Sequence, residues 1–230
     1  MIDFNSLPKK MQSKEVKEYY DILAKKQASL AIKRVFDFVF AFILLIILAI
    51  PMLVIALFIV LDSKGGVFYR QERVTTNCKV FRIHKFRTMV ADADKKGSLV
   101  TVGHDSRITK IGAFLRKYRL DEMPQLLDIL SGDMSFVGTR PEAVKYVKAY
   151  TNEMMATLLL PAGITSEASI RYKDEADLLD GAADVDQVYI HDVLPGKMKY
   201  NLDSIRHFSF LADIVTMFRT ILAVLGKDYD

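Results

Sequence analysis

The feature that most constrains this chain of 230 residues is a run of 24 residues, Phe38–Leu61, that carries no charge. About 20 apolar residues suffice to span a bilayer as a helix. The run also lacks a polar face that could turn to water, so it does not fit the surface of a water-soluble domain. We expect it to enter a membrane.

The residues of the run leave its path through the membrane open. Pro51, near the middle, removes a helix hydrogen bond and clashes with the preceding turn, which predicts a kink. Basic residues flank the run on both sides: Lys25, Lys26, Lys33 and Arg34 before it, and Lys64, Arg70 and Arg73 after it. The positive-inside rule keeps both flanks in the cytoplasm. A re-entrant helix bent at Pro51 satisfies both facts, and an ordinary kinked transmembrane helix is the alternative.

Asp37 lies at the edge of the apolar run, three residues after Arg34 and four after Lys33, so a helix places all three on one face. An acid at that depth is costly unless it is paired. We expect Lys33, Arg34 and Asp37 to pin the helix at the membrane interface. The alternative is an acid that reaches out to the headgroups.

This pattern divides the chain into three parts. Residues 1–32 form a polar, mostly helical lead that lies on the membrane surface or on the domain. Residues 33–62 form the membrane helix, and residues 63–230 suffice for one compact domain. Residues 66–89 have the two β-rich runs and the polar turn of a β-hairpin, and residues 91–106 are a loop or lid by composition.

Shorter elements fill the rest of the domain. Two helices should meet at Asp121, which a proline three residues later places at or near an N-cap. Residues 134–137 predict a short strand, and residues 161–165 predict a turn. Apolar residues at helical spacing over 208–225 predict an amphipathic helix that rests on the core by default, with the bilayer as the alternative. We therefore expect a mainly helical α/β (α+β) domain at a membrane.

Charge and cysteine content narrow the function classes. The formal net charge of +4 suggests an anionic partner such as phosphate, a membrane surface or nucleic acid. Cys78 is the only cysteine, which excludes a disulfide scaffold. The first 34 residues are charged and mixed, and no secretory signal peptide is expected in them.

Asp121 and Glu122 are adjacent acids that follow the basic run RKYR, residues 116–119. A helix N-terminus would keep Asp121 ionised and would also attract a phosphate, so this carboxylate could attack phosphorus and form an acyl phosphate. Such an attack brings anion against anion. It needs cations and a divalent metal, for which Glu122 offers a hard-oxygen ligand. On these two residues alone, simple helix capping is the stronger explanation.

The basic segments Lys79–Arg87 and Arg107–Arg119 could form solvated faces, lie on anionic lipid or bind nucleic acid. We set nucleic acid aside, because the adjoining apolar segment offers anionic lipid more directly. Arg140, in the turn GTRPE, could grip a pyrophosphate in bidentate fashion. A purely structural Gly/Pro turn explains the same residues equally well.

Several motifs occur in a fixed order: KRVFD at 33–37, KFRTM at 85–89, HDSRITKIGAFLRKYRLDEMPQLLDILSGDMSFVGTRPE at 104–142, and PAGIT at 161–165. Together they resemble the bacterial sugar transferase family, the monotopic phosphoglycosyl transferases. The resemblance runs from about Lys33 to Ile170 and continues more weakly through residues 194–206. The long central block is highly specific.

The resemblance implies an enzyme that transfers a sugar 1-phosphate from a nucleotide sugar, usually a UDP-sugar, to polyprenyl (undecaprenyl) phosphate and releases UMP. The product would be the first membrane-bound intermediate of a bacterial surface glycan or exopolysaccharide. The enzyme would be monotopic in the bacterial inner (cytoplasmic) membrane, with its catalytic domain, residues 63–230, on the cytoplasmic face. Mg²⁺ is the implied cofactor, no nucleic acid partner is expected, and a homodimer is left open.

The resemblance also implies roles for individual residues. Asp121 would be the covalent nucleophile, and Glu122 would assist it, with both acids at the Mg²⁺ site. The membrane helix would be re-entrant and broken at Pro51. The cluster at its base would consist of Lys33, Arg34 and Asp37. The residues implied to bind substrate are Lys85, Arg87, Arg116, Gln125, Arg140, Pro141 and Arg171.

The chain departs from the family pattern at three places. Thr139 replaces the first proline of the usual Pro-Arg-Pro turn, which puts the contact to the base in doubt. Ile50 stands before Pro51, where the family often has serine. Residues 166–179, SEASIRYKDEADLL, stand where many members have a segment of the GWAQVNGR type, so a sugar preference should not be transferred.

Two other hypotheses fit parts of the sequence. One is a non-catalytic membrane-bound scaffold in glycan assembly, with a basic face on anionic lipid. The other is a phosphatase-like use of Asp121, against which the membrane segment argues, because hydrolysis of a soluble substrate needs no bilayer. Removal of the metal distinguishes a transferase from a scaffold: the transferase should lose its activity in EDTA, whereas adhesion to lipid should not change.

Overall fold

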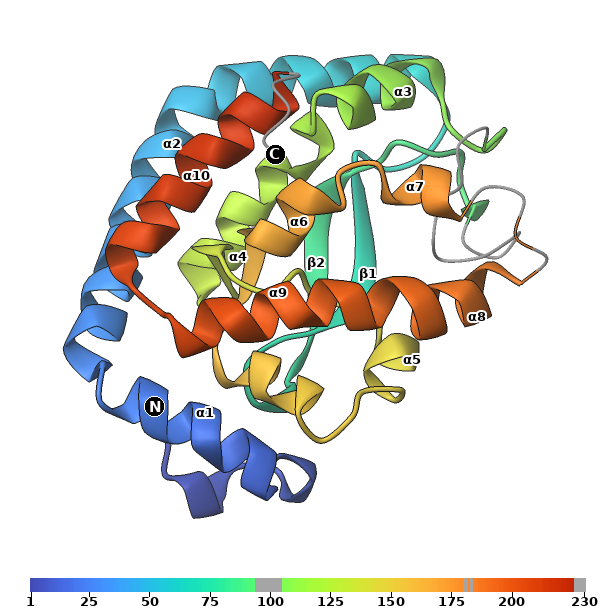
Figure 1. Ribbon diagram of the computed structural model, residues 1–230. Coiled ribbons are helices and arrows are strands. Elements are labelled where there is room, and N and C mark those ends of the chain that lie inside the picture. Colours follow the sequence, from blue (N-terminus) through green and yellow to red (C-terminus); the bar gives the residue numbers. More distant parts are fainter. Residues whose placement is uncertain (94–104, 180–181, 183, 226–230) are drawn as a thin grey trace.

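The computed structural model describes residues 1–93, 105–179, 182 and 184–225. The fold is mainly helical, with two small two-stranded sheets between the helices (Figure 1). The α-helices are α1 Lys14–Ala24, α2 Gln27–Asp62, α3 Lys110–Lys117, α4 Leu126–Ser131, α5 Val144–Val147, α6 Glu167–Arg171, α7 Glu175–Leu178, α8 Val185–Val188, α9 Leu194–Arg206 and α10 Phe210–Val224. The strands are β1 Phe68–Val74, β2 Val80–Phe86, β3 Met134–Val137 and β4 Ala162–Thr165. Shorter helical turns include the 3₁₀ helices η1 Phe4–Ser6, η2 Lys9–Met11, η3 Thr76–Cys78, η5 Leu120–Gln125 and η6 Met154–Leu159, and the π-helical turn η7 Tyr189–Val193.

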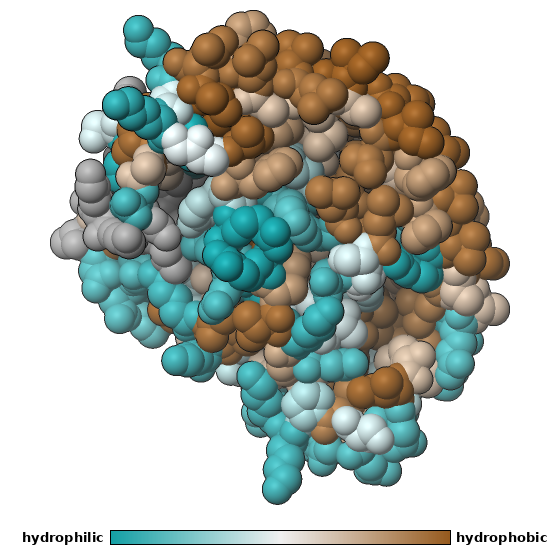
Figure 2. Space-filling model, turned by 180° about the vertical axis from the view of Figure 1, so that it is seen from behind, coloured by the Kyte–Doolittle hydropathy of each residue, from teal (hydrophilic) through white to brown (hydrophobic). Residues whose placement is uncertain are grey.

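The predicted long apolar helix is confirmed as α2. It is continuous through Pro51, and its ribbon rises along one side of the molecule and then turns over the top (Figure 1). It is long and apolar enough to cross a membrane. Between Phe38 and Leu61 only Ala41 and Ile59 are buried, and the apolar surface that results is the brown band along the top and edge of Figure 2. Most of this helix therefore faces away from the domain. A re-entrant path remains a prediction.

The predicted β-hairpin is also confirmed. Strands β1 and β2 pair antiparallel, in a register that joins Phe68 to Phe86 and Val74 to Val80. The connection is tight because Asn77 and Cys78 both adopt a positive φ, 54° and 61°. The hairpin places one face of β2 against η5, the segment that carries the two acids.

The second sheet corrects one prediction. Residues 161–165 are not a turn, because Ala162–Thr165 forms β4, which pairs in parallel with the predicted strand β3. The two backbones approach closely where Gly163 meets Gly138. A Cβ atom on Gly163 would lie 2.2 Å from the Gly138 nitrogen. The glycine that indicates a turn in the sequence is here required by close packing of two chain segments.

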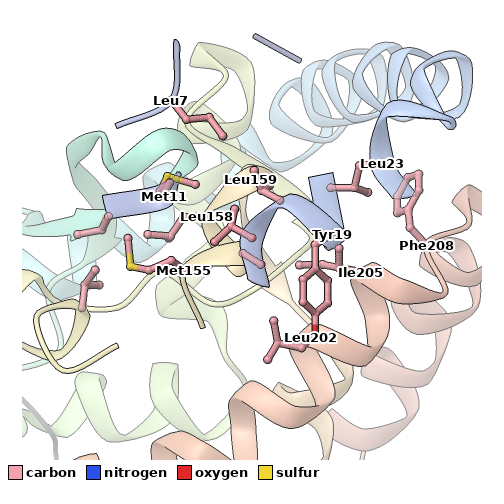
Figure 3. Close-up of a cluster of buried hydrophobic side chains, with 14 residues drawn as sticks. Leu7, Met11, Tyr19, Leu23, Met155, Leu158, Leu159, Leu202, Ile205 and Phe208 are labelled. Carbon is pink, nitrogen blue, oxygen red and sulfur yellow. The ribbon is translucent and has the colours of Figure 1, made fainter. Parts of the chain in front are cut away.

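Residues 1–32 pack on the domain through α1. Val16, Tyr19 and Leu23 are buried in one cluster with residues of η6 and α9. Figure 3 shows Tyr19 and Leu23 pointing toward Ile205 and Phe208, with Leu158 and Leu159 alongside. The lead is thus part of the folded unit. Most of the predicted loop or lid at 91–106 lies outside the described residues.

The C-terminal helix forms as predicted, but its position differs from the default expectation. No residue of Phe210–Val224 is buried, and the stripe made by Leu211, Val215, Phe218 and Ile221 is exposed. The helix lies beside α2 at the edge of the molecule (Figure 1). Its apolar stripe therefore does not rest on the core. Other residues of the helix contact the domain, both polar (Asp213, Arg219 and Thr220) and apolar (Phe210 and Met217).

The close approach of β3 and β4 gives a test of the fold. Gly163→Ala should lower the free energy of unfolding by about 1–3 kcal/mol, because the new methyl group overlaps backbone atoms that cannot rotate away. Gly66→Ala is the matched control, since a Cβ there has nothing within 4 Å. Thermal unfolding of the two variants would be compared. Equal melting temperatures would contradict the packing described here.

Candidate functional site

Asp121 and Glu122 lie in the first turn of η5, which leads directly into α4. The chain reaches them from α3 through Arg119, whose backbone is left-handed with a φ of 56°. That conformation costs a non-glycine residue about 1 kcal/mol. Arg119 occupies the cap position, so Asp121 lies two residues inside the helix instead of at the N-cap. The sharp turn brings both acids against β2.

Glu122 is held by two cations. Its Oε1 lies 3.0 Å from Lys85 Nζ on β2 and 2.5 Å from Arg140 Nη2, while its Oε2 accepts from Arg140 Nη1 at 3.2 Å. Burial opposes ionisation of this carboxyl, but the charges of Arg140 and Lys85 outweigh it and hold the pKa of Glu122 well below its usual range. Glu122 is therefore a fixed negative charge.

Asp121 is in a different environment, although it is the neighbouring residue. It is buried, and its nearest cation is Lys85 at 4.0 Å. Among the described residues no donor forms a hydrogen bond to its carboxylate. Burial raises the pKa of Asp121, against the opposing charge of Lys85. A carboxylate with few partners is more basic and keeps an oxygen available for attack.

The two acids form part of the lining of a cavity of about 920 Å³. Five predicted binding residues line the same cavity: Lys85, Arg87, Arg116, Arg140 and Pro141. Arg116 is largely enclosed, and burial lowers the pKa of its guanidinium. A cavity with this cationic lining and an available carboxylate suits a pyrophosphate.

Arg87 borders the same cavity, but its guanidinium has other partners. It donates to the carbonyls of Ile59, Ser63 and Lys64 at 3.3, 2.8 and 2.5 Å, which lie at the C-terminal end of α2. A cation at this position satisfies carbonyls that the helix leaves unpaired. The arrangement is that of a helix C-cap, and contact with substrate remains a prediction.

Gln125 and Arg171 do not line the cavity that holds the acid pair. Gln125 is the last residue of η5 and is fully buried. Neither its amide nitrogen nor its amide oxygen has a hydrogen-bond partner within the described part of the chain. Arg171 lies outside the lining of the cavity, pairs with Glu167 at 2.8 Å and covers the ring of Tyr200. The structure gives neither residue a contact that supports a role in binding.

A buried polar network at the inner end of the cavity was not predicted. Lys197 Nζ lies 2.8 Å from Glu175, 2.9 Å from the Tyr189 hydroxyl and 3.5 Å from Glu142. Tyr189 donates to Glu142 at 2.6 Å. The network joins α9 to the turn that carries Arg140. Glu142 ends the GTRPE motif, whereas Glu175, Tyr189 and Lys197 come from later segments, so only their meeting in the fold reveals the network.

The three residues predicted to anchor α2 contact the domain. Lys33 Nζ lies 2.7 Å from Asp213 of α10, and Arg34 donates to a carbonyl at the end of α4 at 2.7 Å. Asp37 is buried and accepts from Ser135 of β3 at 2.8 Å. Asp37 thus faces the domain and not the headgroups. Pro51 lies 14 residues further along α2, outside this cluster.

The acids also offer ligands to a metal ion. Among the described residues, no group of three or more His, Cys, Asp and Glu side chains could hold one. Mg²⁺ commonly binds through one or two carboxylates together with substrate phosphates. Asp121 has a free oxygen, whereas both oxygens of Glu122 already accept from cations. The pair fits an ion that arrives with a phosphate and is held mainly by Asp121.

Comparisons with known proteins agree on one family. The profile of the family described as bacterial sugar transferase matches residues 28–227. A Bacillus subtilis protein provisionally named as an undecaprenyl-phosphate N-acetylgalactosaminyl 1-phosphate transferase is 43% identical over 166 residues, covering 71% of this chain and 88% of that protein. An Aeromonas hydrophila UDP-N-acetylgalactosamine-undecaprenyl-phosphate N-acetylgalactosaminephosphotransferase is 33% identical over 84% of this chain. An Escherichia coli UDP-glucose:undecaprenyl-phosphate glucose-1-phosphate transferase is 32% identical over 83%. The match spans 44% and 39% of those last two proteins.

The unequal environments of the acids predict opposite effects on stability. Glu122→Gln should lower the free energy of unfolding by about 3 kcal/mol, because it leaves Lys85 and Arg140 buried without their counter-charge. Asp121→Asn should leave that free energy unchanged or raise it, because the raised pKa of Asp121 means that folding disfavours its ionised form. Denaturant unfolding at neutral pH would measure both. Equal losses would show that the two carboxylates are held alike.

Proposed function

The chain belongs to the bacterial sugar transferase family, and from this premise we propose that it transfers a sugar 1-phosphate from a UDP-sugar to undecaprenyl phosphate. The product would begin assembly of a bacterial surface glycan. One observation carries the proposal: two cations neutralise Glu122, while Asp121 beside it stays available to the cavity. A phosphoglycosyl transferase needs this division between a fixed charge and a nucleophile.

The first step uses Asp121. One of its carboxylate oxygens attacks the phosphorus that bears the sugar, and an O–P bond forms. The bond from that phosphorus to the bridging oxygen of the diphosphate breaks, and its electron pair leaves with UMP. Lys85, Arg116 and Arg140 line the space where the phosphate oxygens would lie, and their positive charge offsets the repulsion between anions.

The second step restores the enzyme. A phosphate oxygen of undecaprenyl phosphate attacks the same phosphorus, the bond to Asp121 breaks, and the carboxylate is released. Bound Mg²⁺ would supply Lewis-acid neutralisation of the phosphate oxygens. In this chain Asp121 and Glu122 would hold it, and Glu122 would in addition keep Lys85 and Arg140 in place.

The membrane placement follows from α2. A lipid acceptor carries its phosphate at the membrane interface, so the domain has to remain there. We propose that α2 is re-entrant and that the domain lies on the cytoplasmic face, because basic residues flank the apolar run on both sides. The names of the relatives differ in the sugar, N-acetylgalactosamine or glucose, so we propose no particular sugar.

The covalent step can be tested without the acceptor. Purified protein with Mg²⁺ and a panel of UDP-sugars should gain the mass of one sugar phosphate and release one equivalent of UMP. Asp121→Asn should gain none, and EDTA should abolish the adduct on the wild type. Intact-protein mass spectrometry measures the adduct and names the sugar. If no donor gives an adduct and no UMP appears after undecaprenyl phosphate is added, the transferase proposal fails.

A further inference from the structure

The cavity above the acid pair has two chemically different ends. The end at Asp121 is lined by cations, as described above. The other end is lined by Leu44 and Leu48 of α2, Ile164 of β4, and Ala223 and Val224 of α10. These residues carry no charge, and the hydroxyls of Thr165 and Thr220, which also line the cavity, hydrogen-bond to each other. A UDP-sugar has no hydrocarbon chain, so it has less to gain from this second end than a molecule with an apolar tail.

Helix α10 is held in its place beside the cavity by three contacts between its first turn and Thr220. Asp213 meets Lys33 of α2 at 2.7 Å, and Arg219 meets Glu167 of α6 at 2.8 Å. Thr220 shares a hydrogen bond of 2.7 Å with Thr165 of β4. These contacts all lie on one side of the helix and position Ala223 and Val224. The apolar end is therefore a built part of the cavity.

This apolar end continues into the exposed apolar surface of the molecule. Val224 lines the cavity and is still 38% exposed, which places it at the rim. Ile47 on α2 and Leu225 after α10 are exposed just beyond. The surface on α2 is the brown band of Figure 2. At Val224 the apolar lining of the cavity thus opens toward the face that we assign to the bilayer.

We propose that the slot between α2 and α10, defined by Leu44, Leu48, Ala223 and Val224, binds the isoprenyl units nearest the phosphate of the lipid acceptor. The inference rests on the proposed function and adds a subsite to it. A molecule with an anionic head and a hydrocarbon tail matches both ends of the cavity: its phosphate lies among the cations near Asp121, and its tail leaves through the slot. Ala223 sets the width of the slot because it is the smallest of these side chains.

The test separates the two half-reactions. Ala223→Trp should fill the slot, so that the adduct forms with the UDP-sugar as in the wild type, while the KM for undecaprenyl phosphate in mixed micelles rises at least tenfold. Ala212→Trp is the matched control, because Ala212 lies on the same helix, is exposed and does not line the cavity. It should change neither half-reaction.

Each outcome decides the proposal. If Ala223→Trp forms the adduct and transfers to undecaprenyl phosphate with an unchanged KM, the slot is not the acceptor subsite. If it folds with the melting temperature of the wild type but forms no adduct, this end of the cavity serves the donor, and the proposal is wrong. Where Ala223→Trp does not fold, Val224→Trp at the open rim takes its place. Absence of the adduct on the wild type would instead reject the proposed function.

Discussion

A helix without a polar face has to be joined to a polar domain through the few hydrogen-bonding groups near its ends, and the rest of this structure depends on how that is done. Near the start of α2, Lys33, Arg34 and Asp37 reach α10, α4 and β3. At the other end, Arg87 donates to the last carbonyls of the helix, and Asp62 accepts from the backbone of α3. Buried charges are costly when unpaired, so these contacts fix one orientation of the helix on the domain.

The elements that receive α2 are the same ones that build the site. Segment η5 and helix α4 follow one another without a break, so the contacts that place α4 against α2 also place Asp121 and Glu122. Strand β2 supplies Lys85 to Glu122 and, one residue earlier, His84 to Asp128 of α4 at 2.6 Å. The orientation of the membrane helix and the geometry of the acid pair are thus coupled through a short stretch of chain. This coupling suits a reaction between a soluble donor and a lipid.

Local patterns sufficed for α2, the β-hairpin and α10, since each is encoded by periodicity within one segment. Strand β4 was missed because its partner β3 lies far away in sequence, and because the glycine that permits their close approach indicates a turn when read alone. Periodicity also predicts the apolar stripe of α10 without indicating what covers it. Motifs in the sequence predicted Lys85 and Arg140 as binding residues. That both cations pair with Glu122 and leave Asp121 without a close partner depends on distances in the folded structure, which the sequence does not contain.

The buried network around Glu142 limits which segments of this chain can be replaced in a chimera. Tyr189 and Lys197, the two residues whose side chains donate to this carboxylate, lie in the C-terminal third of the domain, while Glu142 itself follows the turn that carries Arg140. A chimera that took residues 166–206 from another chain would leave Glu142 as a buried carboxylate without donors, unless that segment placed a tyrosine and a lysine where Tyr189 and Lys197 lie. Such a chimera therefore has to take the turn at Glu142 together with Tyr189 and Lys197, which contact it in space although 47 and 55 residues separate them from it along the chain.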